Sequence, residues 1–210
     1  DSINRFGYSA SAISILSSIY EEINRIDKAV ETFMKLEESD TQKGQGYYQL
    51  GRLFNRKSNP QKAIEYFEKY LPFRPISDAD IFITLGNLYE LVGNIDKAVN
   101  NYIRLEDINS HRGNGHYYIG LLYEKKGRLV DALKEFEYSL EIMPTNSNIL
   151  LKIGELYENI GNNRKALEIY KKAIAIDPIK EIELNHAIAR CYEKIGERVM
   201  ALSILKRIEN

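Results

Sequence analysis

The stretch "LGNLYELVGNIDKA", residues 85–98, decides the fold because it returns along the chain in altered form. Residues 119–132 read "IGLLYEKKGRLVDA", and residues 153–166 read "IGELYENIGNNRKA". Most letters change between the copies, while a glycine, a tyrosine, a second glycine and an alanine keep their places. A fixed period of this kind is the signature of a repeat architecture, in which one supersecondary unit is stacked many times.

Four columns of residues continue this period over nearly the whole chain, at steps of 34 or 35 residues. One column is alanine throughout: Ala29, Ala63, Ala98, Ala132, Ala166 and Ala201. An aromatic column precedes it: Tyr20, Phe54, Tyr89, Tyr123, Tyr157 and Tyr192. A second aromatic column follows and ends in leucine: Phe33, Phe67, Tyr102, Phe136, Tyr170 and Leu205. A column of small residues completes the set: Ser17, Gly51, Gly86, Gly120, Gly154 and Ala189.

Within each copy the apolar spacing is helical. In the third copy an apolar stripe runs over residues 82–89 and a second over residues 95–105, with Gly93 between them. Glycine closes many helices in the left-handed conformation, and the same break recurs at Gly127, Gly161 and Gly196. Each copy is therefore predicted to be two helices of about 12 to 14 residues joined by a tight turn. In the second copy, Asn59 and Pro60 are suited to begin the second helix.

The small residues have a packing explanation. We expect Gly86 and Ala98 to lie on facing helices whose backbones approach closely, while Tyr89 fills the space between one copy and the next. One helix pair cannot bury this surface alone, so the copies must stack.

These columns resemble the tetratricopeptide repeat family, whose 34-residue unit carries Leu-Gly, Tyr, Gly, Ala, Phe, Ala and Pro in this order. The resemblance implies an all-α fold, a right-handed superhelical α-solenoid of helix-turn-helix repeats. It covers residues 10–210 as a single array, preceded at 1–9 by an N-terminal extension or the end of a preceding element. The repeats fall at about 10–43, 44–77, 79–112, 113–146, 147–180 and 182–210. A pentatricopeptide RNA-binding array has a similar period, but the near-neutral charge and the Gly and Ala columns argue against it.

Composition sets the broad class. Hydrophobic residues make up 44% and charged residues 28% of the 210 residues, which is typical of a soluble folded protein. The net charge of -1 gives no field that would draw the whole chain to nucleic acid or to an anionic membrane, and no apolar run is long enough to span one. The single cysteine excludes an internal disulfide and favours the cytoplasm, with a bacterial periplasm as the alternative.

No motif for chemistry is present. The chain has no Gly-rich phosphate loop, HExxH, paired CxxC or GxSxG, so we predict no enzyme, no cofactor and no metal site. His116 occupies a column of bulky packing residues, and Cys191 stands in a column of buried aliphatic residues. A glutamate recurs once per repeat, and we expect it at solvated helix positions: Glu21, Glu90, Glu124, Glu158 and Glu193.

The resemblance implies that the first helices line a concave groove, which such arrays use for extended partner segments. One column projected onto this groove is apolar in its middle members and predicts an exposed apolar stripe, a usual mark of an interaction site. Charged residues beside the stripe alternate in basic, acidic and basic blocks, which suits a protein segment of mixed charge. The candidate partner-binding residues are Tyr48, Arg52, Asn55, Arg56, Ile83, Asn87, Glu90, Tyr117, Leu121, Glu124, Leu151, Glu155 and Arg190.

Two functions follow as expectations. The first is a non-enzymatic adaptor or scaffold that binds a protein or peptide segment in the groove, without nucleic acid and without membrane insertion. The residues of the family's chaperone-tail clamp are not rebuilt in any register. The alternative is a structural subunit of a larger assembly, as in ciliary, cell-cycle, bacterial envelope or flagellar complexes, joined through its ends and convex face. The last helix is apolar on more than one side, which indicates self-association or continuation of the chain there.

Overall fold

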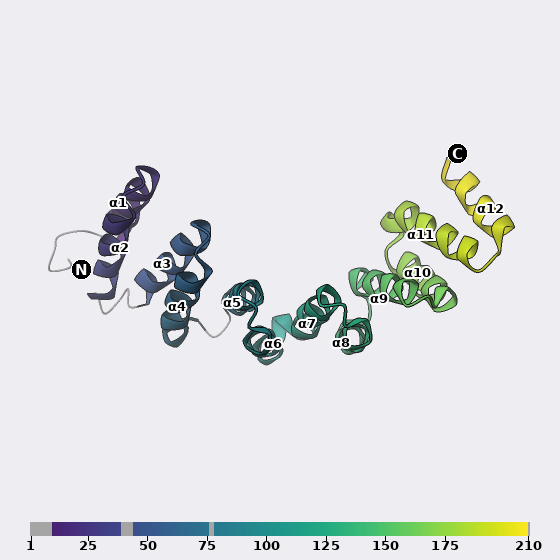
Figure 1. Cartoon of the computed structure of the whole chain (residues 1–210), viewed down its shortest axis with the longest axis horizontal. Coiled ribbons are helices and arrows are strands. Elements are labelled where there is room, and N and C mark those ends of the chain that lie inside the picture. Colours follow the sequence, from purple (N-terminus) through teal and green to yellow (C-terminus); the bar gives the residue numbers. More distant parts are fainter. Residues whose placement is uncertain (1–9, 39–43, 76–77, 210) are drawn as a thin grey trace. The chain divides into compact units, whose positions relative to one another are not determined.

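The computed structural model describes residues 10–38, 44–75 and 78–209, and every regular element in these ranges is a helix (Figure 1). This confirms the all-α solenoid of helix-turn-helix repeats. The backbone contacts divide the chain into two compact units, Asp1–Asn101 and Tyr102–Asn210. Each unit is described by itself.

In the first unit, a first helix packs against the second helix of its own repeat, α1 on α2 and α3 on α4. The second helices then pack on the next first helix, α2 on α3 and α4 on α5. The helices are α1 (Ala10–Glu22), α2 (Ile26–Met34), α3 (Gln45–Arg56), α4 (Pro60–Tyr70), α5 (Asp80–Leu91) and α6 (Ile95–Ile103), the last of which runs just past the boundary.

The second unit repeats this order. Helix α8 packs on both α7 and α9, and α10 packs on both α9 and α11. The helices are α7 (Asn114–Lys125), α8 (Leu129–Ile142), α9 (Ser147–Asn159), α10 (Asn163–Ile176), α11 (Glu181–Lys194) and α12 (Arg198–Glu209). Short 3-10 turns stand at Lys35–Glu38, Leu71–Phe73, Arg104–Asp107, Asn109–His111 and Pro178–Lys180.

The turns inside the repeats have the predicted conformation. Gly93, Gly127, Gly161 and Gly196 all have positive φ, between 71° and 87°. In the first two repeats, where the glycine is replaced, Asn24 and Ser58 adopt the same region, at 57° and 54°. The start of α4 is also confirmed, because the side chain of Asn59 accepts a hydrogen bond from the Lys62 backbone N–H at 3.1 Å and Pro60 opens the helix.

Two second helices are shorter than predicted. Helices α2 and α6 have 9 residues each, and both continue as a 3-10 turn that carries a glutamate. Glu37 accepts a hydrogen bond from the backbone N–H of Gly44, and Glu106 from that of Gly113, each at 2.8 Å. These glycines precede α3 and α7 with φ near +87°, so each glutamate satisfies N–H groups at the start of the next helix.

At the glycine column, what approaches the first helix is an aromatic side chain of the second helix, and not its backbone as predicted. A β-carbon added at Gly120 would lie 2.8 Å from the ring of Phe136, and one added at Gly51 would lie 2.5 Å from the ring of Phe67. The ring of the second helix therefore lies over the glycine of the first helix in the same repeat, and the absence of a β-carbon makes room for it.

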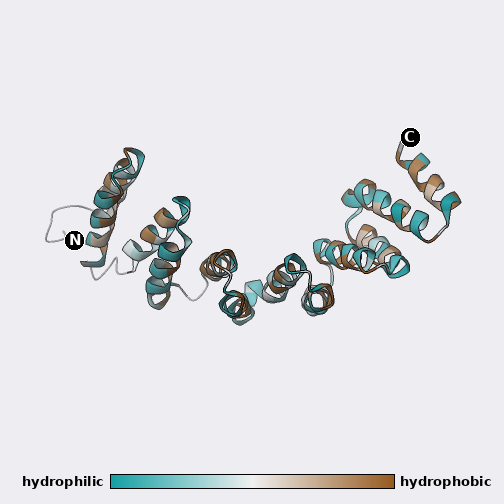
Figure 2. Cartoon of the chain, viewed as in Figure 1, coloured by the Kyte–Doolittle hydropathy of each residue, from teal (hydrophilic) through white to brown (hydrophobic). Residues whose placement is uncertain are grey.

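The tyrosine column does connect successive repeats, as predicted. The hydroxyl of Tyr89 donates to Glu68 on the preceding second helix, and that of Tyr157 donates to Glu137 at 3.2 Å. Hydrophobic and hydrophilic residues are interspersed along the helices, brown and teal in Figure 2.

Candidate functional site

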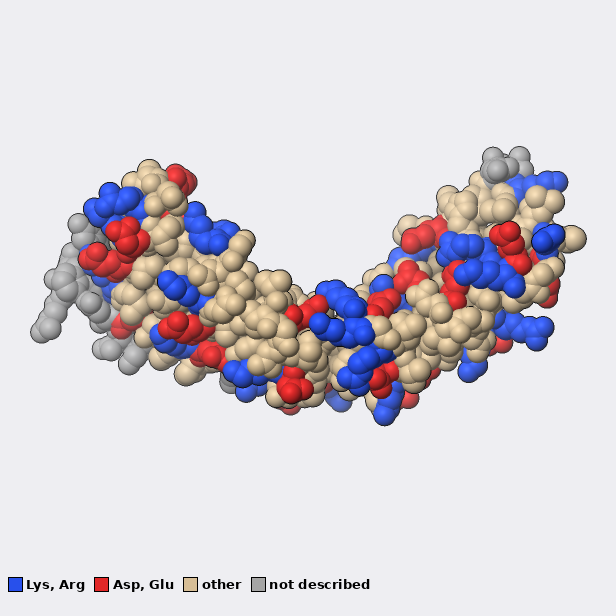
Figure 3. All heavy atoms as spheres, viewed as in Figure 1, with Lys and Arg blue, Asp and Glu red and all other residues tan. Residues whose placement is uncertain are grey.

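The candidate partner-binding residues all lie on first helices. Within the first unit they stand on α3 and α5, and within the second unit on α7, α9 and α11. Acidic and basic side chains are interspersed with uncharged atoms over the face shown in Figure 3, in keeping with the net charge of -1.

The apolar stripe is less exposed than the sequence predicted. Tyr48, Ile83, Tyr117 and Leu151 are each half-buried. The ring of Tyr48 lies 5.0 Å from that of Tyr70, and its neighbours on α4 cover one side of it. The stripe is partly covered, because Tyr48 and Tyr117 pack against aromatic rings on the second helix of their own repeat.

Tyr117 and Leu121 follow the same rule in the second unit. The Tyr117 ring lies 5.6 Å from that of Phe136, and Leu121 is packed at the edge of the same hydrophobic cluster. The first helices therefore offer an apolar floor that is already anchored before any partner binds.

Several of the candidate charges are held by neighbours. The guanidinium of Arg52 lies over the Tyr48 ring at 5.9 Å. Arg56 forms a two-pronged ion pair with Glu21 of α1, with its Nε donating at 2.9 Å. This contact joins the first helices of successive repeats. Asn55 and Asn87 are exposed, and Glu90 is half-buried.

A similar bridge joins α7 and α9. The ammonium group of Lys152 lies 3.5 Å from a carboxylate oxygen of Glu124 and 2.9 Å from one of Glu155. Two candidate residues of the acidic block are thus brought together by a lysine that sequence reasoning did not select.

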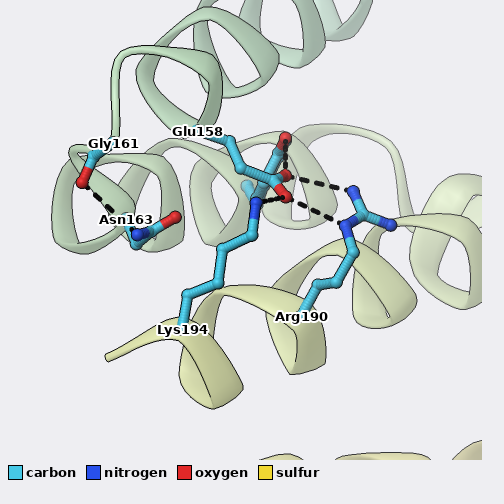
Figure 4. Close-up of polar contacts among 6 residues, drawn as sticks. Glu158, Gly161, Asn163, Arg190 and Lys194 are labelled. Carbon is cyan, nitrogen blue, oxygen red and sulfur yellow. Dashed lines mark hydrogen bonds and ion pairs between the residues drawn. The ribbon is translucent and has the colours of Figure 1, made fainter. Parts of the chain in front are cut away.

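The most buried charged group on these faces is Glu158 of α9 (Figure 4). Arg190 of α11 donates from Nε and a terminal nitrogen to its two carboxylate oxygens at 2.9 and 3.0 Å, and Lys194 donates at 2.8 Å. The Tyr170 hydroxyl donates to the same group at 3.2 Å. The hydrogen bond from Arg190, helped by that from Lys194 and opposed by burial, lowers the pKa of Glu158 to about 2.

The expectation that the glutamate column is solvated was wrong at Glu158, which is only 9% exposed. The signal that could have found this arrangement is a pairing across copies. A glutamate of one repeat is followed by a basic residue at the next position of the following repeat, as Glu21 is by Arg56 and Glu158 by Lys194. Sequence reasoning considered each column alone and missed the relation between columns.

The remaining reactive side chains are part of the packing. Cys191 is fully buried, as predicted, and burial, with the nearby Glu158 carboxylate, raises the pKa of its thiol to about 11. The His116 ring is half-buried, with Nδ1 2.8 Å from a Glu135 oxygen. In the described ranges, His, Cys, Asp and Glu nowhere gather in groups of three or more that could hold a metal ion. Nor do these ranges contain a helix with the length and apolar character needed to cross a membrane.

Comparison with known proteins agrees with this architecture. Family models described as tetratricopeptide repeat match residues 10–43, 44–75, 113–146 and 147–180, which together are more than half of the chain. No curated protein matches the sequence.

Similar solved structures are solenoids of the same kind. A crystal structure of MamA protein has 22% identity and a TM-score of 0.62, and the match covers 79% of this chain and 89% of that one. The C-terminal part of a TPR repeat-containing protein from Cytophaga hutchinsonii has 17% identity and a TM-score of 0.72, covering 92% of this chain and 76% of that one. At these identities the likeness concerns the fold alone. The repeat columns, the helix pairs and the matching family models together show that this chain belongs to the tetratricopeptide repeat family.

Proposed function

We propose that this protein is a non-enzymatic scaffold that binds an extended segment of a partner protein along the faces of its first helices. Repeats of this family generally bind protein partners, and the chain is a protein-interaction scaffold in that general sense. The observation that carries the proposal is the mixed character of these faces. Each unit has a half-buried apolar floor, with Tyr48 in the first unit and Tyr117 in the second, and exposed polar side chains such as Arg52 and Asn87 stand on the same helix faces of the first unit.

Such a surface suits an extended peptide. Apolar side chains of the peptide would complete the burial of the tyrosine rings, and its polar groups would pair with the exposed residues. Because the floor is held by Phe136 and Tyr70 before binding, little ordering entropy is lost in forming the complex.

The test is a selection of binding peptides from a random displayed library, followed by affinity measurement on two charge-reversal variants. Arg52→Glu changes an exposed position on the first-helix face of α3, and Lys172→Glu makes the same change at an exposed position on second helix α10. We expect peptides that recognise the first unit to lose at least about tenfold in affinity with Arg52→Glu and to be unaffected by Lys172→Glu. Equal effects of the two variants, or no effect of Arg52→Glu on any selected peptide, contradict the proposal.

A second candidate function is that of a structural subunit joined to a larger assembly through its ends and its convex face. A specific observation favours it. Apolar side chains are exposed on the terminal helices α1 and α12, among them Ile15, Ile19, Val199 and Leu202. Helices that only cap a solenoid carry a polar outer face.

A further inference from the structure

The sixth repeat departs from the others in the column of bulky residues on the first helix. Five repeats have a large or aromatic side chain there, and the sixth has an amide. The column reads Ile13, Tyr47, Phe82, His116, Leu150 and Asn185. Asn185 of α11 is almost as deeply buried as Phe82 and Leu150, at 5% exposed against 2% and 3%. A polar group therefore occupies a packing position.

The amide of Asn185 is only half satisfied. Its Nδ2 donates to Oε1 of Glu181 over a long 3.4 Å, and its Oδ1 accepts no hydrogen bond from the part of the chain that the structure describes. Because a carboxylate only accepts, the amide nitrogen must face Glu181, and the oxygen is the atom without a partner. Buried polar atoms of folded proteins nearly always have a partner, so this oxygen indicates that a ligand supplies the missing donor.

A pocket of about 320 Å³ opens beside this amide, between the second helices α10 and α12, and α11 forms its floor. This volume is at the small end of the range for ligand pockets. The apolar lining is Ile174 of α10, Ile188 and Tyr192 of α11, and Met200 and Ile204 of α12. Two polar contacts stand at the rim, since Lys171 donates to the Tyr192 hydroxyl and Arg207 donates to Glu181, each at 3.1 Å. The Asn185 oxygen is thus an unpaired acceptor in a mainly apolar pocket.

The equivalent space in the fourth repeat is filled by a ring. Three residues of the pocket have counterparts there: His116 for Asn185, Glu135 for Ile204 and Tyr138 for Arg207. The His116 ring lies between α7 and α8, with Nδ1 2.8 Å from a Glu135 oxygen and its centroid 5.4 Å from that of Tyr138. Because asparagine is shorter than histidine and carries no ring, the same space in the sixth repeat stays open.

We infer that this pocket receives an aromatic side chain of a partner protein, a tryptophan or tyrosine whose N–H or O–H donates to Oδ1 of Asn185. The ring lies against the aliphatic side chains of Ile174, Ile188 and Ile204, and its one polar atom meets the one unpaired acceptor. A small molecule with several polar groups does not suit the pocket, because most of those groups would be buried without partners.

The pocket lies on the side of the second helices. The inference therefore develops the second candidate function, a subunit joined to an assembly through its convex face, and it does not depend on peptide binding along the first-helix faces. A chain that fails to bind the ring but still joins an assembly loses this pocket alone, whereas a chain that binds the ring and joins no assembly loses the second candidate function.

Titration with N-acetyl-tryptophanamide tests the inference, because this probe carries the indole ring on a peptide backbone. The methyl NMR signals of Ile188 and Ile204 report binding in the pocket. We expect saturable shifts with a dissociation constant of about 1 mM, since one residue supplies only part of a partner's contact. The analogue methylated at the indole nitrogen keeps the ring but has no N–H, and it should bind about tenfold more weakly.

A matched pair of variants locates the site. Asn185→Leu restores the apolar column, as Leu150 has it, and removes the acceptor. We expect this variant to unfold at the temperature of the wild type or above it, because no unpaired amide remains buried, and to bind the probe at least about tenfold more weakly. Asn159→Leu makes the same substitution at an exposed position on α9 and should leave binding unchanged.

Three results overturn the inference. The first is a wild-type chain that does not bind N-acetyl-tryptophanamide, and the second is binding that Asn185→Leu leaves unchanged. The third is binding of free indole without binding of the amide probe, which would assign the pocket to a small molecule instead of a partner's side chain. Arg52→Glu, on the first-helix face of α3, should leave probe binding unchanged, so the failure of this proposal is separate from that of peptide binding along the first helices.

Discussion

At the scale of the residue, the glycine of each first helix determines how closely the second helix approaches. A β-carbon at Gly120 would lie 2.8 Å from the Phe136 ring, which is itself fully buried and cannot move without disturbing its neighbours. Gly120→Ala is therefore expected to lower the free energy of unfolding by about 1–3 kcal/mol. Urea denaturation followed by circular dichroism measures this change.

The matched control is a glycine whose role is conformational. Gly127 has a φ of 71° and no atom near its missing β-carbon. Asparagine tolerates this conformation, as Asn24 does in the equivalent turn, so Gly127→Asn should change the free energy of unfolding by less than about 1 kcal/mol. If Gly120→Ala lowers the free energy of unfolding by no more than Gly127→Asn does, the packing of the Phe136 ring does not depend on the space above Gly120.

At the scale of the element, a glutamate at the end of a second helix secures the start of the next first helix. Glu106 accepts hydrogen bonds from the backbone N–H groups of Gly113 and Gly115, at 2.8 and 2.9 Å. Glu106→Ala removes both acceptors and should lower the free energy of unfolding by about 1–2 kcal/mol, the usual cost of losing a helix cap. Asp107→Ala, one residue further along at an exposed position, is the control and should have little effect. Faster amide exchange at the start of α7 in the first variant alone would locate the effect.

The contact between α9 and α11 should depend on pH. The pKa of Glu158 is lowered to about 2 in the folded chain, below that of an unfolded glutamate near 4.3. As the pH falls, the unfolded chain binds the proton first, so the stability that Glu158 contributes is complete above about pH 5 and is lost as the pH approaches about 2. We expect a contribution of about 2 kcal/mol at neutral pH, allowing for solvent screening of the half-exposed Arg190 and Lys194.

The measurement is the difference in the free energy of unfolding between the wild type and Glu158→Gln, taken at pH 7 and again near pH 3. The difference should shrink by about half at the lower pH, because near pH 3 unfolding of the wild type is favoured by proton uptake at Glu158, which the Gln variant lacks. A difference that does not change with pH would mean that Glu158 does not act through its charge.

At the scale of the whole molecule, sequence periodicity predicts the helix pairs because each repeat column has one dominant physical role. The turn at Gly93, the ring at Phe136 and the alanine at Ala132 are required by backbone conformation or by volume, and such requirements recur in every copy. Contacts between columns were not predicted in this way. The bridge from Glu158 to Arg190 depends on which residues of two copies meet, and the half-burial of Tyr117 depends on how its side chain leans toward α8.

The same distinction applies to the ends. The repeat column that contains Ile19 predicts a buried side chain, because five of the six residues in that column have a preceding repeat to pack against. In the described part of the chain, Ile15 and Ile19 of α1 in the first unit and Leu202 and Leu205 beside the groove of α12 in the second are exposed.

Amide hydrogen exchange tests the central claim most directly, because it reports which helices of the scaffold a partner contacts. Exchange is measured on the free chain and on its complex with a selected peptide. Binding along the first-helix faces predicts slower exchange in α3, α5, α7 or α9, with the second helices α4, α6, α8 and α10 unchanged. Protection that falls on the second helices, with the first helices unaltered, would contradict the account.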